Sequence, residues 1–176
     1  MEQRRSDKGF YTVPFVWNKT LWVMTFVVFG VWIVPSMWML YEICTLPNAT
    51  EQLVGLILLN VIMLPMILIC EGLAPQRLEI AADEIRILRR YKSVTITRSE
   101  IKSIEQLPEV AMRAAIRTCG VGGCFGYFGY YYTPVIGSFK LYATSFKSLY
   151  LIKMWNGKQV VVSCAEPEIM EQFIER

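Results

Sequence analysis

The chain has 176 residues, of which 54% are hydrophobic, and its net charge at neutral pH is +3. It contains no histidine, which excludes Ser-His-Asp and Cys-His catalysis as well as histidine metal sites. The five cysteines match no metal or disulfide spacing, and an excess of three basic residues is too small for a nucleic-acid surface, so we expect no cofactor, no metal and no nucleic-acid partner.

Two apolar segments near the N-terminus are long enough to cross a membrane. Leu21–Tyr41 and Leu53–Cys70 contain no Lys, Arg, Asp or Glu and are 21 and 18 residues long. At about 1.5 Å per residue, a helix of either length can cross a hydrocarbon core about 30 Å thick. A signal peptide is the alternative for the first segment, but its apolar region is too long and no A-x-A site follows. We expect transmembrane helices over 21–41 and 53–70, joined by an external loop over 42–52.

The charges that flank the two segments predict their orientation. Residues 1–20 carry four basic and two acidic side chains, whereas the loop carries only Glu42 and Glu51. Positively charged flanking residues stay in the cytoplasm. We therefore expect a multi-pass protein of the cytoplasmic (inner) membrane, with a cytoplasmic N-terminal tail over 1–20 and a cytoplasmic C-terminus.

Asn60 is the one strongly polar side chain in the middle of either apolar segment. A polar residue inside a membrane is a functional candidate, but a single amide without an ionisable partner more often hydrogen-bonds to a neighbouring helix. Two helices without charge also make a poor transport path. We expect Asn60 to serve helix packing or self-association, and the helix pair to serve as an anchor.

The remaining chain contains short alternating patterns that predict β-strands. After a linker over 71–76, apolar and polar residues alternate in several short windows. Asn156-Gly157 predicts a tight hairpin, because both turn positions need positive φ. From Pro167 onward, the apolar residues recur with helical spacing instead. We expect a membrane α-hairpin plus a β-rich (α+β) domain over 77–176, in which about seven antiparallel strands form a small open barrel closed by a C-terminal helix.

The order of these elements resembles the pleckstrin-homology (PH) superfold, and more narrowly the bacterial PH-domain family of small membrane proteins. The resemblance covers residues 76–176. It is carried by Leu78-Glu-Ile80, Glu84-Ile-Arg-Ile87, Ser99-Glu-Ile101, Arg117-Thr-Cys-Gly120, Gly126, Gly129, Leu141-Tyr-Ala-Thr144, Val160-Val-Val-Ser163 and Glu166-Pro167. It implies this fold and a membrane location, but it implies no defined ligand.

Residues 119–130 are rich in glycine and aromatic residues and show no helical period. They lack the G-x-x-x-x-G-K-[ST] pattern of a phosphate-binding loop, so we expect a loop between strands in which glycine supplies unusual backbone angles. The aromatic residues here exceed what one strand face can bury. Two alternatives remain. The aromatic residues are exposed and contact a protein partner or the membrane interface, or they pack within the protein on a barrel edge or on the anchor helices. These residues are Phe125, Tyr127, Phe128, Tyr130, Tyr131 and Tyr132.

A basic run crosses the second and third predicted strands. It consists of Arg86, Arg89, Arg90, Lys92 and Arg98. In membrane-binding PH domains, basic residues between the first strands hold a phosphoinositide, but the corresponding turn here is the acidic Asp83-Glu84. Two alternatives remain, a general attraction of the run to anionic lipid headgroups and a solvated strand face.

The expected linker spans at most about 20 Å, so the domain must lie against the inner leaflet. Lipid affinity is then not needed for recruitment, and confinement favours contact with a membrane partner. We therefore predict a non-enzymatic, membrane-anchored PH-like interaction or regulatory module that acts through a protein partner or through self-association as a homo-oligomer. The alternative is an anionic-lipid-sensing module that uses the basic run.

Overall fold

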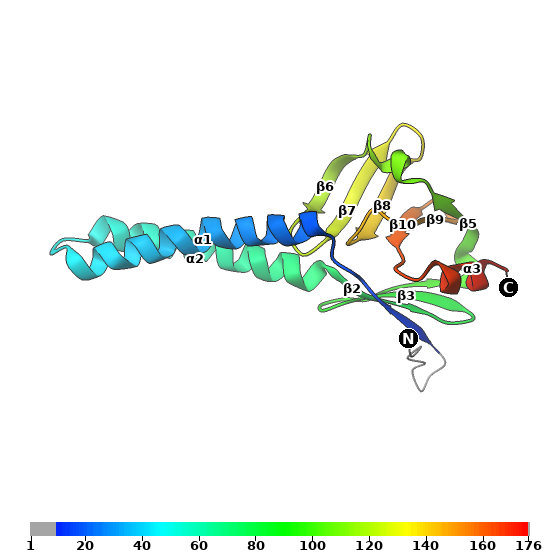
Figure 1. The fold of residues 1–176 in the computed structure, drawn as a ribbon, viewed down its shortest axis with the longest axis horizontal. Coiled ribbons are helices and arrows are strands. Elements are labelled where there is room, and N and C mark those ends of the chain that lie inside the picture. The colour runs from blue at the N-terminus through cyan, green and yellow to red at the C-terminus, as the bar shows by residue number, and fades with distance from the viewer. Residues whose placement is uncertain (1–9, 176) are drawn as a thin grey trace.

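The computed structural model describes residues 10–175 and shows a long helical hairpin that projects from a β-rich domain (Figure 1). Helices α1 (Lys19–Thr45) and α2 (Thr50–Leu73) lie side by side. The predicted segments lie inside these helices, and both helices are long and apolar enough to cross a membrane. Only 6% of the apolar window of each helix is buried, whereas the core helix of a soluble domain would be mostly covered.

Sheet 1 contains four antiparallel strands in the order β1-β2-β3-β4. They are β1 (Tyr11–Pro14), β2 (Pro75–Ile80), β3 (Glu84–Arg89) and β4 (Val94–Thr97). The expectation of a tail over 1–20 needs correction, because β1 pairs along its whole length with β2; residues 1–9 lie outside the described residues. The expected linker over 71–76 is also absent, since α2 ends at Leu73 and β2 begins at Pro75.

Sheet 2 has the strand order β5-β9-β10-β8-β7-β6. Its strands are β5 (Ile101–Leu107), β6 (Ile116–Gly122), β7 (Tyr127–Thr133), β8 (Gly137–Ala143), β9 (Leu149–Met154) and β10 (Gln159–Ser163). Neighbouring strands are antiparallel except for β8 and β10, which are parallel. The 3-10 turn η1 (Arg98–Glu100) leads from sheet 1 into sheet 2. Ten strands in two sheets therefore replace the expected seven-stranded open barrel in the described residues.

The main core lies between the two sheets and is completed by helix α3 (Pro167–Glu175). Ile87 of sheet 1 and Ile152 of sheet 2 are both fully buried in it. Helix α3 is amphipathic, and it buries Met170 and Phe173 in the same core. Each fully buried side chain of this size stabilises the fold by about 1.5–3 kcal/mol. The helix therefore completes a core between two sheets and does not close a barrel.

A second core covers the other face of sheet 2. Strands β5 and β6 lie at opposite edges of this sheet, so the chain between them must cross one of its faces. That segment contains the 3-10 turn η2 (Glu109–Met112), and Met112 packs with Leu141, Leu151 and Val161. Because sheet 2 is buried on both faces, its central strands are continuous apolar runs rather than alternating ones.

The Gly-rich stretch that was expected to be a loop forms most of the β6–β7 hairpin. Gly120 and Gly129 face each other across this hairpin, with φ of +146° and +123°. A Cβ atom on either residue would overlap the backbone of the opposite strand, so the close approach requires glycine at both positions. The tip of the hairpin contacts the base of α1, where Gly123 packs against Met24.

Candidate functional site

A groove of about 520 Å³ lies where the edge of sheet 1 faces sheet 2. Strand β4 forms one wall with Val94, Thr95 and Ile96, and the rest is formed by Glu100 of η1 and by residues of β7, β8 and the β9–β10 hairpin. Strand β4 is the last strand of sheet 1, so its outer edge pairs with no other strand of the described residues. Such an edge presents backbone N–H and C=O groups to which an extended peptide can bind.

Exposed aromatic residues extend the groove along the face of sheet 2. Tyr130 and Tyr132 on β7 are 53% and 42% exposed, and Ile116, opposite Tyr132 on β6, is 63% exposed. The Nζ atom of Lys140 lies 5.0 Å from the ring centroid of Tyr130. The surface combines aromatic area with a cation at its edge, which is typical of protein interfaces.

The side chain of Gln159, the first residue of β10, lies on the face of sheet 2 opposite the groove, because its neighbour Val160 points into the main core. Its Nε2 atom donates to the carbonyl of Ile136 at 3.2 Å, whereas its buried Oε1 atom has no partner within residues 10–175. A buried acceptor without a partner costs about 1–3 kcal/mol. Because this oxygen is buried beside Ile136 of the second core, a segment bound in the groove does not reach it.

The six aromatic residues predicted to form one contact loop lie in different environments. Phe128 is buried in the core between the sheets, and Tyr131 is buried in the second core, where its hydroxyl donates to the Val121 carbonyl at 3.0 Å. This burial raises the pKa of Tyr131. The ring centroid of Tyr127 lies 4.5 Å from that of Phe146. Phe125 contacts the helical hairpin, which leaves Tyr130 and Tyr132 as the exposed members of the group.

The comparison with protein families identifies the domain that carries the groove. A family model described as "Bacterial PH domain" matches residues 76–176, which is more than half of the chain. The chain belongs to the bacterial PH domain family. The predicted resemblance is thus confirmed, and PH domains are in general interaction modules without catalytic activity. The comparisons with curated proteins and with solved structures found no match.

The bacterial PH domain holds the base of the helical hairpin from two sides. At the tip of the β6–β7 hairpin, the Phe125 amide donates to Thr25 Oγ1 of α1 at 3.3 Å. At the β3–β4 turn, the Tyr91 amide donates to the Gly72 carbonyl and the Tyr91 hydroxyl donates to the Leu68 carbonyl of α2, both at 3.1 Å. Each sheet therefore contributes one loop to the junction, which fixes the orientation of the groove relative to the helices.

The basic run of the PH domain does not converge on one pocket, because four of its five side chains contact groups of their own chain. The contacts are Arg86 with Glu84, Arg89 with the Lys92 carbonyl, Arg90 with Glu71, and Arg98 with the Phe173 carbonyl. The hydrogen bond and the charge of Glu71 raise the pKa of Arg90. These contacts use the cations to join neighbouring segments of the chain.

Asn60 lies where the two long helices meet. The indole Nε1 of Trp32 on α1 donates to Asn60 Oδ1 at 3.2 Å, and Asn60 Nδ2 donates to the Leu56 carbonyl at 2.8 Å. Both ends of the amide are therefore hydrogen-bonded, one of them across the helix pair. In hydrocarbon, unlike in water, the Trp32 N–H and the Asn60 oxygen have no solvent partner. Forming the hydrogen bond between them there therefore breaks no hydrogen bonds to water.

Proposed function

We propose that this protein is a membrane-anchored interaction module, in which α1 and α2 cross the inner membrane and the PH domain binds a partner on the cytoplasmic side. The apolar surface of both helices is exposed along their length, and its transfer from water into hydrocarbon is favourable. The basic residues that precede Leu21 favour the cytoplasmic side for the N-terminus. The module acts by binding, without catalysis.

The combination of features in the groove carries the proposal. An unpaired β4 edge and the exposed ring of Tyr130 lie along one groove, with the ammonium group of Lys140 beside the ring. We infer that its occupant is an extended segment of a protein partner that adds as a strand to β4. Lys140 and Lys158 outnumber Glu100 in the lining, which favours an acidic segment. Lipid sensing by the basic run has less support, because those side chains share no site.

Site-specific photo-crosslinking in cells tests this function. A photoreactive phenylalanine analogue replaces Tyr130 in the full-length protein, and a matched variant carries it at Val110, which is 63% exposed on the opposite face of sheet 2. We expect a defined adduct from position 130 and none from position 110. The charge reversals Lys140→Glu and Lys158→Glu should weaken the adduct if the segment is acidic.

The adduct mass and the control decide between the outcomes. An adduct of twice the protomer mass identifies a second copy of this chain as the occupant and supports self-association. An adduct with another protein supports the partner form of the proposal. The absence of any adduct at position 130, or equal adducts at both positions, contradicts a function that resides in this groove.

A further inference from the structure

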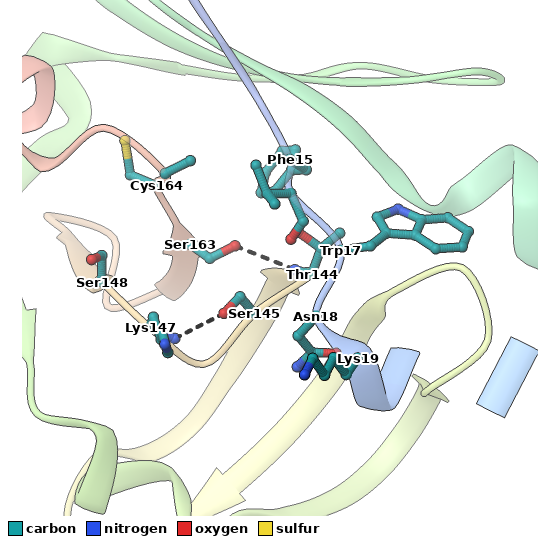
Figure 2. A pocket seen from close by; sticks show the side chains of 12 residues that line it. Phe15, Trp17, Asn18, Lys19, Thr144, Ser145, Lys147, Ser148, Ser163 and Cys164 are labelled. Atoms are coloured by element: carbon teal, nitrogen blue, oxygen red, sulfur yellow. Dashed lines mark hydrogen bonds between the residues drawn. The ribbon is translucent and has the colours of Figure 1, made fainter. Parts of the chain in front are cut away.

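A second cavity lies where the PH domain meets the start of α1, away from the groove. It encloses about 590 Å³ between the β8–β9 loop, the end of β10 and the segment that joins β1 to α1 (Figure 2). Lys147 and Ser145 come from the β8–β9 loop, Ser163 comes from β10, and Lys19 is the first residue of α1. Three segments that are distant in sequence therefore supply polar side chains to one cavity.

Hydrogen-bond donors dominate this cavity. Its described lining includes Lys19 and Lys147 and contains no Asp or Glu residue. Ser163 Oγ accepts from the Thr144 amide at 3.3 Å, and Ser145 Oγ accepts from the Lys147 amide at 3.2 Å (Figure 2). Each of these hydroxyl groups has thereby used an acceptor site and retains its own proton for a ligand.

The cavity wall is held in place by buried polar groups. Thr144 is only 1% exposed, and its hydroxyl donates to the Val16 carbonyl at 2.9 Å, which fastens the segment before α1 to the end of β8. Ser163 is 5% exposed. On the far side of the loop, the Cys164 amide donates to the Ser148 carbonyl at 3.0 Å. The backbone and hydroxyl groups of the wall are therefore organised before any ligand binds, which lowers the entropic cost of binding.

We propose that this cavity binds a phosphate group. Two ammonium groups and two hydroxyl protons, with no competing carboxylate, match an anion that has several acceptor oxygens. The position favours the headgroup of an anionic phospholipid as the source. Trp17 and Trp22 lie beside Lys19 in the sequence, their ring centroids are 4.8 Å apart, and indole side chains are enriched at membrane interfaces. A soluble phosphate offers the same chemistry. The lipid source rests on the proposed membrane crossing, whereas the phosphate site does not.

Binding to the full-length protein in a neutral detergent tests the proposal. Native mass spectrometry measures the retention of phosphatidylglycerol and of zwitterionic phosphatidylcholine, and thermal shift measures stabilisation by inorganic phosphate. Lys147→Glu removes one cation at an exposed position, and Ser163→Ala removes one hydroxyl. Lys102→Glu is the control, since Lys102 is also exposed but lies outside this cavity.

We expect the protein to retain phosphatidylglycerol in preference to phosphatidylcholine. The affinity for phosphatidylglycerol should fall about tenfold in Lys147→Glu, fall less in Ser163→Ala and stay unchanged in Lys102→Glu. Stabilisation by inorganic phosphate that needs Lys147, without lipid retention, supports the site but overturns the lipid source. Equal losses in Lys147→Glu and Lys102→Glu, or no response to either anion, overturn the site itself. None of these outcomes depends on crosslinking at Tyr130, so the two proposals fail separately.

Discussion

Gly72 is the point at which the last turn of α2 touches the PH domain. The ring of Tyr91 packs directly on it, and a Cβ atom at this position would overlap that ring. Gly30, in the middle of α1, has no heavy atom within 4 Å of the corresponding position. Gly72 and Gly30 therefore have different physical roles, because of these two glycines only Gly72 permits a tertiary contact that a side chain would prevent.

We expect Gly72→Ala to lower the free energy of unfolding by about 1–3 kcal/mol, because the Tyr91 ring and its two hydrogen bonds must shift. Thermal unfolding of the full-length protein in detergent, followed by tryptophan fluorescence, measures the change. Gly30→Ala is the matched control and should leave the midpoint unchanged or raise it slightly, since alanine has the higher helix propensity. Equal midpoints for the two variants would contradict the contact.

Cys164 is a buried thiol whose ionisation couples to stability. Burial raises its pKa from 9.0 to about 11. Between these values the unfolded chain loses the thiol proton while the folded chain keeps it. The contribution of this group to stability is therefore complete below about pH 9 and falls as pH rises toward 11.

The pH dependence of thiol labelling measures this coupling. At pH 8 we expect Cys164 to react with a thiol reagent far more slowly than the exposed Cys119, because it is buried and about one part in a thousand is thiolate. The difference should shrink as pH rises toward 11 or when denaturant is added. Rapid reaction of a single-cysteine Cys164 variant at pH 8 would show that this thiol is not held in the core.

Strand β1 is the element that joins the start of the hairpin to sheet 1. It contains four residues, and Val13 is 1% exposed in the main core, opposite Leu78 of β2. Because α2 continues directly into β2, pairing of β1 with β2 brings the two ends of the hairpin into adjacent strands. A segment expected to be a free tail therefore closes the connection between hairpin and domain.

The truncation Val13→Ala tests this connection. We expect it to lower the free energy of unfolding by about 1–3 kcal/mol, because it leaves a cavity in the main core. The neighbouring Thr12→Ala, on the other face of β1, should have less effect. Limited proteolysis near the start of α1 gives a second measurement, and cleavage should accelerate only in the Val13 variant. Identical behaviour of the two variants would mean that β1 does not stabilise the domain.

The sequence predicted the helices and the turn that depend on residues close together in the chain. The two apolar runs predicted α1 and α2, and Asn156-Gly157 predicted the place of the β9–β10 turn. Only Gly157 has the expected positive φ, at +80°, whereas Asn156 does not. The arrangement of strands depends on contacts that alternation does not report. Tyr130 and Tyr131 point to opposite faces of one strand, but whether a face is covered depends on sheet 1 and on the crossing segment at η2. The groove and the second cavity were missed for the same reason, since distant segments form them.

The whole molecule is an elongated body in which the PH domain lies at one end of the hairpin and the α1–α2 turn at the other (Figure 1). The junction loops at Phe125 and Tyr91 contact the hairpin only near its base. If the helices cross a membrane, the turn must lie on the opposite side from the domain. The groove and the second cavity then face the same aqueous compartment.

Two exposed cysteines report this arrangement directly. Cys44 lies at the end of α1 next to the turn, whereas Cys119 lies on β6 of the PH domain, and both are exposed. In right-side-out membrane vesicles, we expect a membrane-impermeant maleimide to label a variant that retains only Cys44. A variant that retains only Cys119 should be labelled only after permeabilisation. Labelling of Cys119 but not Cys44 in intact vesicles would reverse the orientation, and equal labelling of both would contradict a membrane crossing, because a hairpin lying on one side of the bilayer leaves both thiols in the same compartment.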